Sequence, residues 1–115
     1  MSVTPYAVAT AVKAICSVRL SKDDATTAHR AVMSALFRAG FDLSSEYPVD
    51  GGMVDVLATI PGSRIAIEID GERPRVKSLR KLRAFDGGRI IVLRGYRPDG
   101  TLEGIDAIIG LRGRK

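Results

Sequence analysis

The first forty residues repeat their apolar positions every three or four residues, which is the period of an amphipathic helix. Thr4-Pro5 is typical of a helix start, because proline is tolerated at the first helical position, and it predicts a helix to about Arg19. Ser21, with Asp24 three residues later, resembles a capping box and predicts a second helix that Gly40 ends. The apolar stripe of this second helix consists of Ala25, Ala28, Val32, Leu36 and Ala39.

After residue 40 the apolar positions alternate with polar ones, as they do in strands with one face buried. Asp50-Gly51-Gly52 and Pro61-Gly62 are turn sequences that separate three such segments. A helix follows, then an almost wholly apolar strand that we expect to lie parallel to the third strand. The predicted elements after residue 40 are strands 41–49, 53–60 and 64–70, helix 73–85, strand 89–94, a turn at 97–100 and a short helix over 101–111.

This order of elements predicts an α/β fold of the mixed α+β kind. Three strands joined by tight turns form a meander, and the third strand, its helix and the fourth strand form a right-handed βαβ unit. We therefore expect a three-layer α/β/α arrangement around a central mixed sheet. The chain is predicted to be a single domain, 1–115, with an additional N-terminal helix in 1–20, a core in 21–95, and a C-terminal turn, short helix and basic tail in 96–115.

The composition of the chain favours some partners and excludes several kinds of metal site. The net charge is +5 and the pI about 9.8, so a polyanion is the first partner to consider. Cys16 and His29 are the sole residues of their kinds, which excludes a disulfide framework, a cysteine zinc cluster and a multi-histidine metal site. The Ala-rich segment 3–20 has no basic residues before it and contains Lys13, so it resembles neither a signal peptide nor a membrane span. A cytoplasmic location without a membrane partner is the expectation.

Acidic residues interrupt two of the predicted strands. Alternation places Glu68 and Asp70 on one face at the carboxyl end of the third strand, and Asp55 lies on the neighbouring antiparallel strand where it can approach Glu68. Burying carboxylates together is unfavourable because of desolvation and like-charge repulsion. A hard divalent cation relieves both costs, because it takes oxygen ligands. A structural role for each acidic residue, in a turn or in an ion pair with arginine, is the alternative, and Glu46 is a weaker additional candidate.

The stretch VDVLATIPGSRIAIEIDG, followed by a lysine-containing helix and RIIVLRG, resembles the core of the PD-(D/E)XK nuclease superfamily, a restriction-endonuclease-like fold. It is most similar to the small branch of very-short-patch-repair endonuclease-like proteins. The similarity covers residues 25–95 and includes the αβββαβ order. It implies that Asp55 and Glu68 bind Mg²⁺ or Mn²⁺ together with the carbonyl of Ile69. Asp70 stands where the family usually has a lysine, and no histidine follows Gly71.

Basic residues surround this acidic group. Ten basic and four acidic side chains lie between Arg64 and Arg97. We expect Lys77 to reach back toward Asp70, where a lysine would orient the attacking water or stabilise the phosphate. Asp55, Glu68, Asp70 and Lys77 are the predicted catalytic residues. The residues predicted to contact the DNA backbone are Arg73, Arg75, Lys77, Arg80 and Lys81.

The sequence therefore predicts a metal-dependent endonuclease that hydrolyses phosphodiester bonds of DNA. With no Trp and few Tyr and Phe, duplex or branched DNA is a better substrate than a single strand that needs a stacking platform. Cutting both strands would require a homodimer. The alternative is a catalytically inactive nuclease fold that binds DNA or a protein partner, which Asp70 and the missing histidine favour. A structural or regulatory module is a third possibility.

Overall fold

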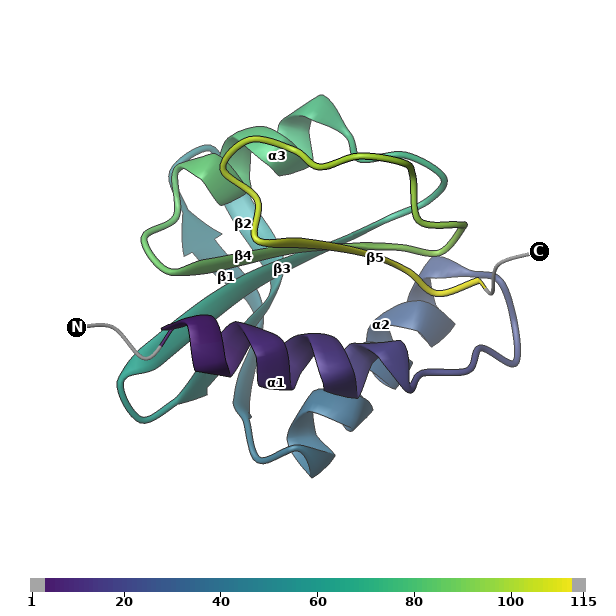
Figure 1. Cartoon of the computed structure of the whole chain (residues 1–115), viewed down its shortest axis with the longest axis horizontal. Coiled ribbons are helices and arrows are strands. Elements are labelled where there is room, and N and C mark those ends of the chain that lie inside the picture. The colour runs from purple at the N-terminus through teal and green to yellow at the C-terminus, as the bar shows by residue number, and fades with distance from the viewer. Residues whose placement is uncertain (1–3, 113–115) are drawn as a thin grey trace.

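The computed structural model describes residues 4–112, which form a mixed α/β fold with helices on both faces of one sheet (Figure 1). Helices α1 and α2 lie on one face, and α3 lies on the other. The elements are α1 (Thr4–Cys16), α2 (Ala25–Arg38), β1 (Asp42–Val49), β2 (Gly52–Ile60), β3 (Ser63–Asp70), α3 (Val76–Arg83), β4 (Gly88–Leu93) and β5 (Ala107–Gly110). The predicted α/β class, with layers of helices on both sides of a mixed sheet, is confirmed.

The sheet has five strands in the order β1-β2-β3-β4-β5. Strands β1, β2 and β3 are antiparallel neighbours, whereas β3, β4 and β5 run parallel. The connection from β3 through α3 to β4 is the predicted βαβ unit. Consequently the carboxyl ends of β3, β4 and β5 meet at the same edge of the sheet, where the start of β2 also lies.

Two apolar clusters separate the faces of the sheet. In β3, Ile65 and Ile67 are buried against the α1/α2 side, while Ala66 belongs to the cluster under α3. Glu68 and Asp70 follow Ala66 in the alternation, so they face α3, as the sequence predicts. Both are buried, with 0% and 2% of their surface exposed.

The C-terminal part of the fold differs from the prediction. The expected helix over 101–111 is wrong: Ala107–Gly110 form β5, which pairs with β4 in parallel. The open edge of β4 accepts this short β-branched segment, and pairing there satisfies backbone groups that would otherwise be unbonded. The predicted N-terminal helix is also shorter, since α1 ends at Cys16. Residues 113–115 of the predicted basic tail lie outside the described residues.

The starts of α2 and α3 differ from the prediction as well. Asp24, not Ser21, caps α2, because its carboxylate accepts the Thr27 N–H at 2.7 Å. Helix α3 begins at Val76 after an extended Arg75, and not at Arg73, where the following Pro74 disfavours helical geometry.

No helix within residues 4–112 is both long enough and apolar enough to cross a bilayer.

The cap of α2 gives a prediction that depends on pH. Hydrogen bonds from Thr27 lower the pKa of Asp24 below its usual value of 3.8. Asp24→Ala should therefore melt at a lower temperature than the wild type at neutral pH, and this difference should disappear as the pH falls below 3.8 toward the lowered folded-state value.

Asp24→Asn is the matched control, because asparagine caps helices nearly as well and does not titrate. Its advantage over Asp24→Ala should not change with pH. Equal melting temperatures of Asp24→Ala and wild type at neutral pH would contradict the assignment of this cap.

Candidate functional site

Strands β2 and β3 separate at two of the acidic residues. Their regular pairing ends at Val56 and Ile67. One or two residues further on, side chains replace the backbone partners: the Asp55 N–H donates to Glu68 Oε2 at 2.9 Å, and the Ile69 N–H donates to Asp55 Oδ2 at 2.7 Å. The two carboxylates thus bind backbone groups that the separation of the strands leaves unpaired. The predicted proximity of Asp55 and Glu68 is observed.

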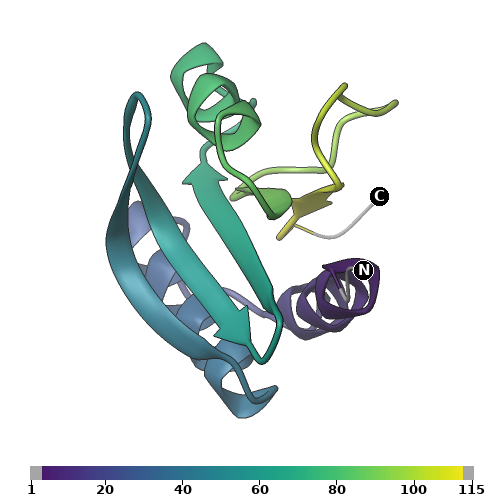
Figure 2. The ribbon, with the colours of Figure 1, turned by 90° about the vertical axis from the view of Figure 1, so that its left-hand side faces the viewer.

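The β1–β2 hairpin changes direction at the same position. Glu46 of β1 has φ 54°, which is rare for a residue other than glycine, and the pairing of β1 with β2 passes from Ser45–Val56 directly to Tyr47–Val54. Val56 packs toward α1 and α2, whereas Val54 packs under α3. The tip of the hairpin therefore curls toward α3 (Figure 2).

Lys81 of α3 lies between the separated strands. Its Nζ donates to the Met53 carbonyl of β2 at 2.8 Å and lies 3.1 Å from Glu68 Oε1 of β3. Its side chain is only 8% exposed. A Cβ atom on Gly52, which has φ 140°, would lie 3.3 Å from Lys81 Cδ, so a glycine at this position gives the lysine room. One ammonium group therefore joins α3 to both strands.

Burial sets the electrostatics of Glu68. Desolvation raises the pKa of its carboxyl group, and the nearby Asp55 charge raises it further, while Lys81 opposes both effects. Glu68 Oε1 is completely buried and, within residues 4–112, has no hydrogen bond of acceptable geometry; it faces the Lys81 ammonium group, and Ser78 also lowers the pKa of this carboxyl group. The ion pair with Lys81 is therefore the main compensation for the burial of this oxygen.

Asp70 serves a different purpose. Its Oδ2 accepts the Arg75 N–H, and its Oδ1 accepts hydrogen bonds from Arg75 Nε and Ser78 Oγ, each at 2.9 Å. The bond to Asp70 raises the pKa of Arg75. Both oxygens of Asp70 are therefore occupied in fixing the start of α3 to the end of β3.

The structure separates the predicted basic residues into two groups. Lys77 is exposed, and Arg75 and Ser78 hold the position near Asp70 that we expected Lys77 to reach. Lys81 is buried, so in this conformation it does not present its charge to a DNA backbone. The predicted contact residues that remain exposed are Arg73, Arg75, Lys77 and Arg80.

Apolar residues recur every three positions in the α3 segment, at Val76, Leu79 and Leu82, and this spacing predicts a buried face that leaves out Ser78 and Lys81. Val76 belongs to that spacing but is 72% exposed. The buried face instead includes Ser78, Lys81 and Leu82, because the first two meet carboxylates of β3. The signal in the sequence was the pair of polar residues Ser78 and Lys81, which are three positions apart, together with two carboxylates in the preceding strand.

The donor set fits a hard divalent cation at Asp55 and Glu68. Asp55 uses Oδ2 for a backbone N–H, which leaves Oδ1 for another ligand, and Glu68 Oε1 is a buried oxygen whose charge Lys81 Nζ now balances at 3.1 Å. Two carboxylates with water and phosphate oxygens are a common ligand set for Mg²⁺. Asp70 does not fit, because its oxygens are engaged. Within residues 4–112 no three His, Cys, Asp or Glu side chains are grouped so as to hold a metal ion among themselves.

Comparisons of the chain with models of known families, with curated proteins and with solved structures found no match.

The buried pair of Glu68 and Lys81 predicts strong coupling between the two residues. Lys81→Met leaves the Glu68 charge buried without a partner and should lower the free energy of unfolding by about 3–5 kcal/mol. In Glu68→Gln/Lys81→Met, which retains an acceptor for the Asp55 N–H, the loss should be smaller than the sum of the single changes by at least about 1 kcal/mol. Urea unfolding of the four proteins measures these values.

Lys77→Met is the matched control, because it removes an exposed lysine one turn earlier in α3 and should change stability by less than about 0.5 kcal/mol. If Lys81→Met were no more destabilised than Lys77→Met, or if the effects at positions 68 and 81 were additive, the pair would have no structural role.

Proposed function

We propose that this protein is a metal-dependent endonuclease that hydrolyses phosphodiester bonds of DNA. The observation that carries the proposal is the convergence of Asp55, Glu68 and Lys81 where β2 and β3 separate. Two carboxylates and one ammonium group, each from a different element, meet at the carboxyl end of a strand in the sheet. Ligands of open α/β sheets bind beyond such strand ends.

Asp55 Oδ1 and Glu68 Oε1 would hold Mg²⁺ or Mn²⁺, and the resemblance to PD-(D/E)XK nucleases adds the carbonyl of Ile69. A bound ion of this kind polarises the phosphate and lowers the pKa of a coordinated water. The protein contributes rigidity, since both carboxylates are fixed by backbone N–H groups at 2.7–2.9 Å. Preorganised ligands of this type need little rearrangement during the reaction.

Lys81 takes the place that the sequence gives to Lys77. Its ammonium group is fixed by the Met53 carbonyl and neutralises the Glu68 charge in the free protein. With a cation held by Glu68, the Lys81 charge would be free to act on the water or on a non-bridging phosphate oxygen. In a poorly solvated site such a charge stabilises the transition state more strongly than it would in water.

The outer surface of α3 supplies the contacts with the DNA backbone. Arg73, Arg75, Lys77 and Arg80 are exposed, and α3 contains no acidic residue. These side chains would fix the orientation of the duplex without reading its sequence. The concentration of positive charge beside a carboxylate pair supports a phosphodiester substrate rather than a neutral one.

Binding of DNA without cleavage is the second candidate. It is favoured by Asp70, which stands where the nucleases that the sequence resembles usually have lysine and which uses both oxygens to hold Arg75 and Ser78. On this alternative the Glu68–Lys81 ion pair is purely structural and the exposed face of α3 carries the function.

Cleavage of supercoiled plasmid tests the proposal. With Mg²⁺ or Mn²⁺ the wild type should produce nicked circles. Asp55→Asn and Glu68→Gln should each lower the rate by about 100-fold or more, and so should Lys81→Met at a temperature where circular dichroism shows that it is still folded. The amide substitutions retain acceptors for the backbone N–H groups, so a loss of rate reports on charge and metal binding rather than on folding, which circular dichroism checks.

Asp42→Asn, a change of an exposed aspartate on β1, is the control and should cut like the wild type. If the wild type binds DNA but cuts none of it with either metal, the nuclease proposal is wrong and the protein binds DNA without cleaving it. Cleavage that persists in both Asp55→Asn and Glu68→Gln would place the active site elsewhere.

A further inference from the structure

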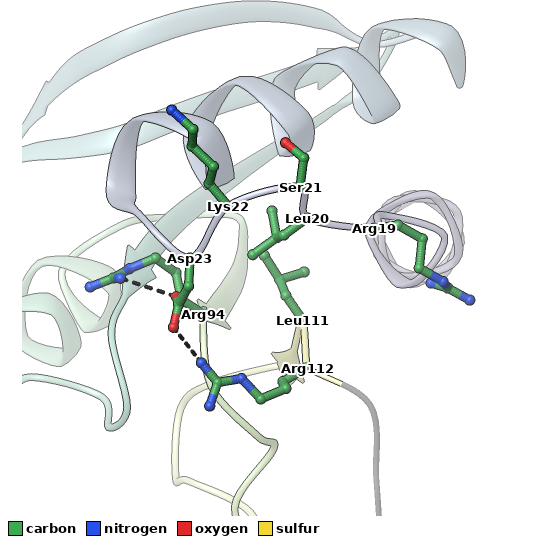
Figure 3. Close-up of a pocket in the computed structure, with 8 residues that line it drawn as sticks. All are labelled: Arg19, Leu20, Ser21, Lys22, Asp23, Arg94, Leu111 and Arg112. Atoms are coloured by element: carbon green, nitrogen blue, oxygen red, sulfur yellow. Dashed lines mark hydrogen bonds and ion pairs between the residues drawn. The ribbon is translucent and has the colours of Figure 1, made fainter.

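A cationic cleft lies beside the candidate active site, between the α1–α2 connection and the carboxyl ends of β4 and β5. Its volume is about 300 Å³. Arg94 follows β4 and Arg112 follows β5, while Asp23 comes from the connection. Leu20 and Leu111 supply apolar surface within the cleft (Figure 3).

Two guanidinium groups converge on one carboxylate in this cleft. Arg94 Nη1 lies 3.3 Å from Asp23 Oδ1, and Arg112 Nη2 contacts Asp23 Oδ2. Figure 3 shows both guanidinium groups turned toward Asp23, whereas the side-chain ends of Arg19 and Lys22 point away from it. The centre of the cleft thus consists of two positive charges around a single negative one.

The two arginines have more N–H donors for an anion than Asp23 uses. A guanidinium group has five N–H donors, and each arginine gives one of them to Asp23. The side chains are 29% exposed for Arg94, 40% for Arg112 and 50% for Asp23. Because ion pairs this exposed contribute little to stability, another anion can displace the carboxylate at low cost. Phosphate suits the pair, since guanidinium groups bind carboxylate and phosphate oxygens with similar geometry.

The cleft continues the edge that carries the acidic residues. The Arg94 N–H donates to the Asp70 carbonyl at 2.9 Å, and the Arg112 N–H donates to the Gly95 carbonyl at 3.2 Å. A Cβ atom on Gly71 would lie 3.1 Å from Arg94 Nη2, so the glycine after Asp70 permits this close approach. Adjacent strands are about 4.8 Å apart. Along one edge, therefore, carboxylates on β2 and β3 are followed by arginines on β4 and β5.

We propose that Arg94 and Arg112 bind a backbone phosphate of the DNA next to the one that is cut, and that Asp23 occupies this position when DNA is absent. The proposal rests on the proposed nuclease function for its ligand. It extends that function, because it adds a second cationic contact on the opposite side of the acidic residues from α3. DNA would then be held on both sides of the scissile bond, which fixes its direction across the sheet edge.

Equilibrium binding to a duplex oligonucleotide in EDTA tests this proposal without any cleavage. Arg94→Gln and Arg112→Gln should each weaken binding about fivefold at about 0.15 M salt and reduce the slope of log K against log salt by about one. Asp23→Asn should bind about threefold more tightly, because the competing charge is gone. Lys77→Gln on α3 should lower the slope as the arginine variants do.

Arg30→Gln is the matched control, because it removes an exposed arginine of α2 that does not line the cleft, and it should leave the slope unchanged. Melting temperatures establish that every variant is folded. If both arginine variants behave like Arg30→Gln and Asp23→Asn binds no more tightly than wild type, the three side chains are a structural clamp and the proposal is overturned.

Inorganic phosphate distinguishes a free anion from a DNA phosphate. Phosphate could raise the melting temperature of Asp23→Asn, and the further change Arg94→Gln could abolish that increase. If both results are found while the DNA affinities of the variants are unchanged, the cleft binds a free anion and the DNA contact is overturned. Binding and cleavage also separate the two proposals. If the arginine variants bind DNA more weakly but the wild type cuts no DNA, only the nuclease proposal is overturned. If the wild type cuts DNA but the arginine variants bind it as well as the wild type does, only the proposal for the cleft is overturned.

Discussion

The buried ion pair between Glu68 and Lys81 determines how α3 sits on the sheet. Glu68 is wholly buried, and removing a carboxylate from water is costly unless an opposite charge accompanies it. Lys81 supplies that charge and also binds the Met53 carbonyl, so the same ammonium group holds the curled β1–β2 hairpin, β3 and α3 together. Asp70 fixes the other end of the helix through Arg75 and Ser78. These polar contacts fix the two ends of the helix, and Leu79 and Leu82 add apolar packing against the sheet.

This arrangement links the architecture to the proposed chemistry. A sheet whose strands remained paired would satisfy Asp55 and Ile69 through the backbone, and no carboxylate would be needed between them. Because β2 and β3 separate, Asp55 and Glu68 each bind a backbone N–H group between the strands through one oxygen, and the second oxygen of Glu68 faces Lys81. The parallel strands β4 and β5 then extend the same edge with arginines. Acidic and basic side chains are therefore arranged in order along one line of strand ends.

The period of apolar residues was sufficient to predict the α/β class, the meander, the βαβ unit and the face of β3 that carries Glu68 and Asp70. The neighbourhood of Asp55 and Glu68 also followed, because tight turns fix antiparallel register. It did not predict β5, since four apolar residues suit a strand or a helix until an open sheet edge is known. The inward position of Lys81 depends on its tertiary partners, because a lysine is rarely buried unless it is paired. Its partners, the Glu68 carboxylate and the Met53 carbonyl, come from strands that are distant in the sequence.

Paramagnetic broadening by Mn²⁺ tests most directly whether Asp55 and Glu68 form a metal site. The amide protons of Asp55 and Ile69 are hydrogen-bonded to the two carboxylates, so their NMR signals report on an ion bound there. Substoichiometric Mn²⁺ should broaden these two amides and their strand neighbours first, and Asp55→Asn should abolish the effect while the fold remains intact. Broadening that is absent, or that is centred on exposed acidic residues such as Asp99 and Glu103, would contradict a metal site between β2 and β3.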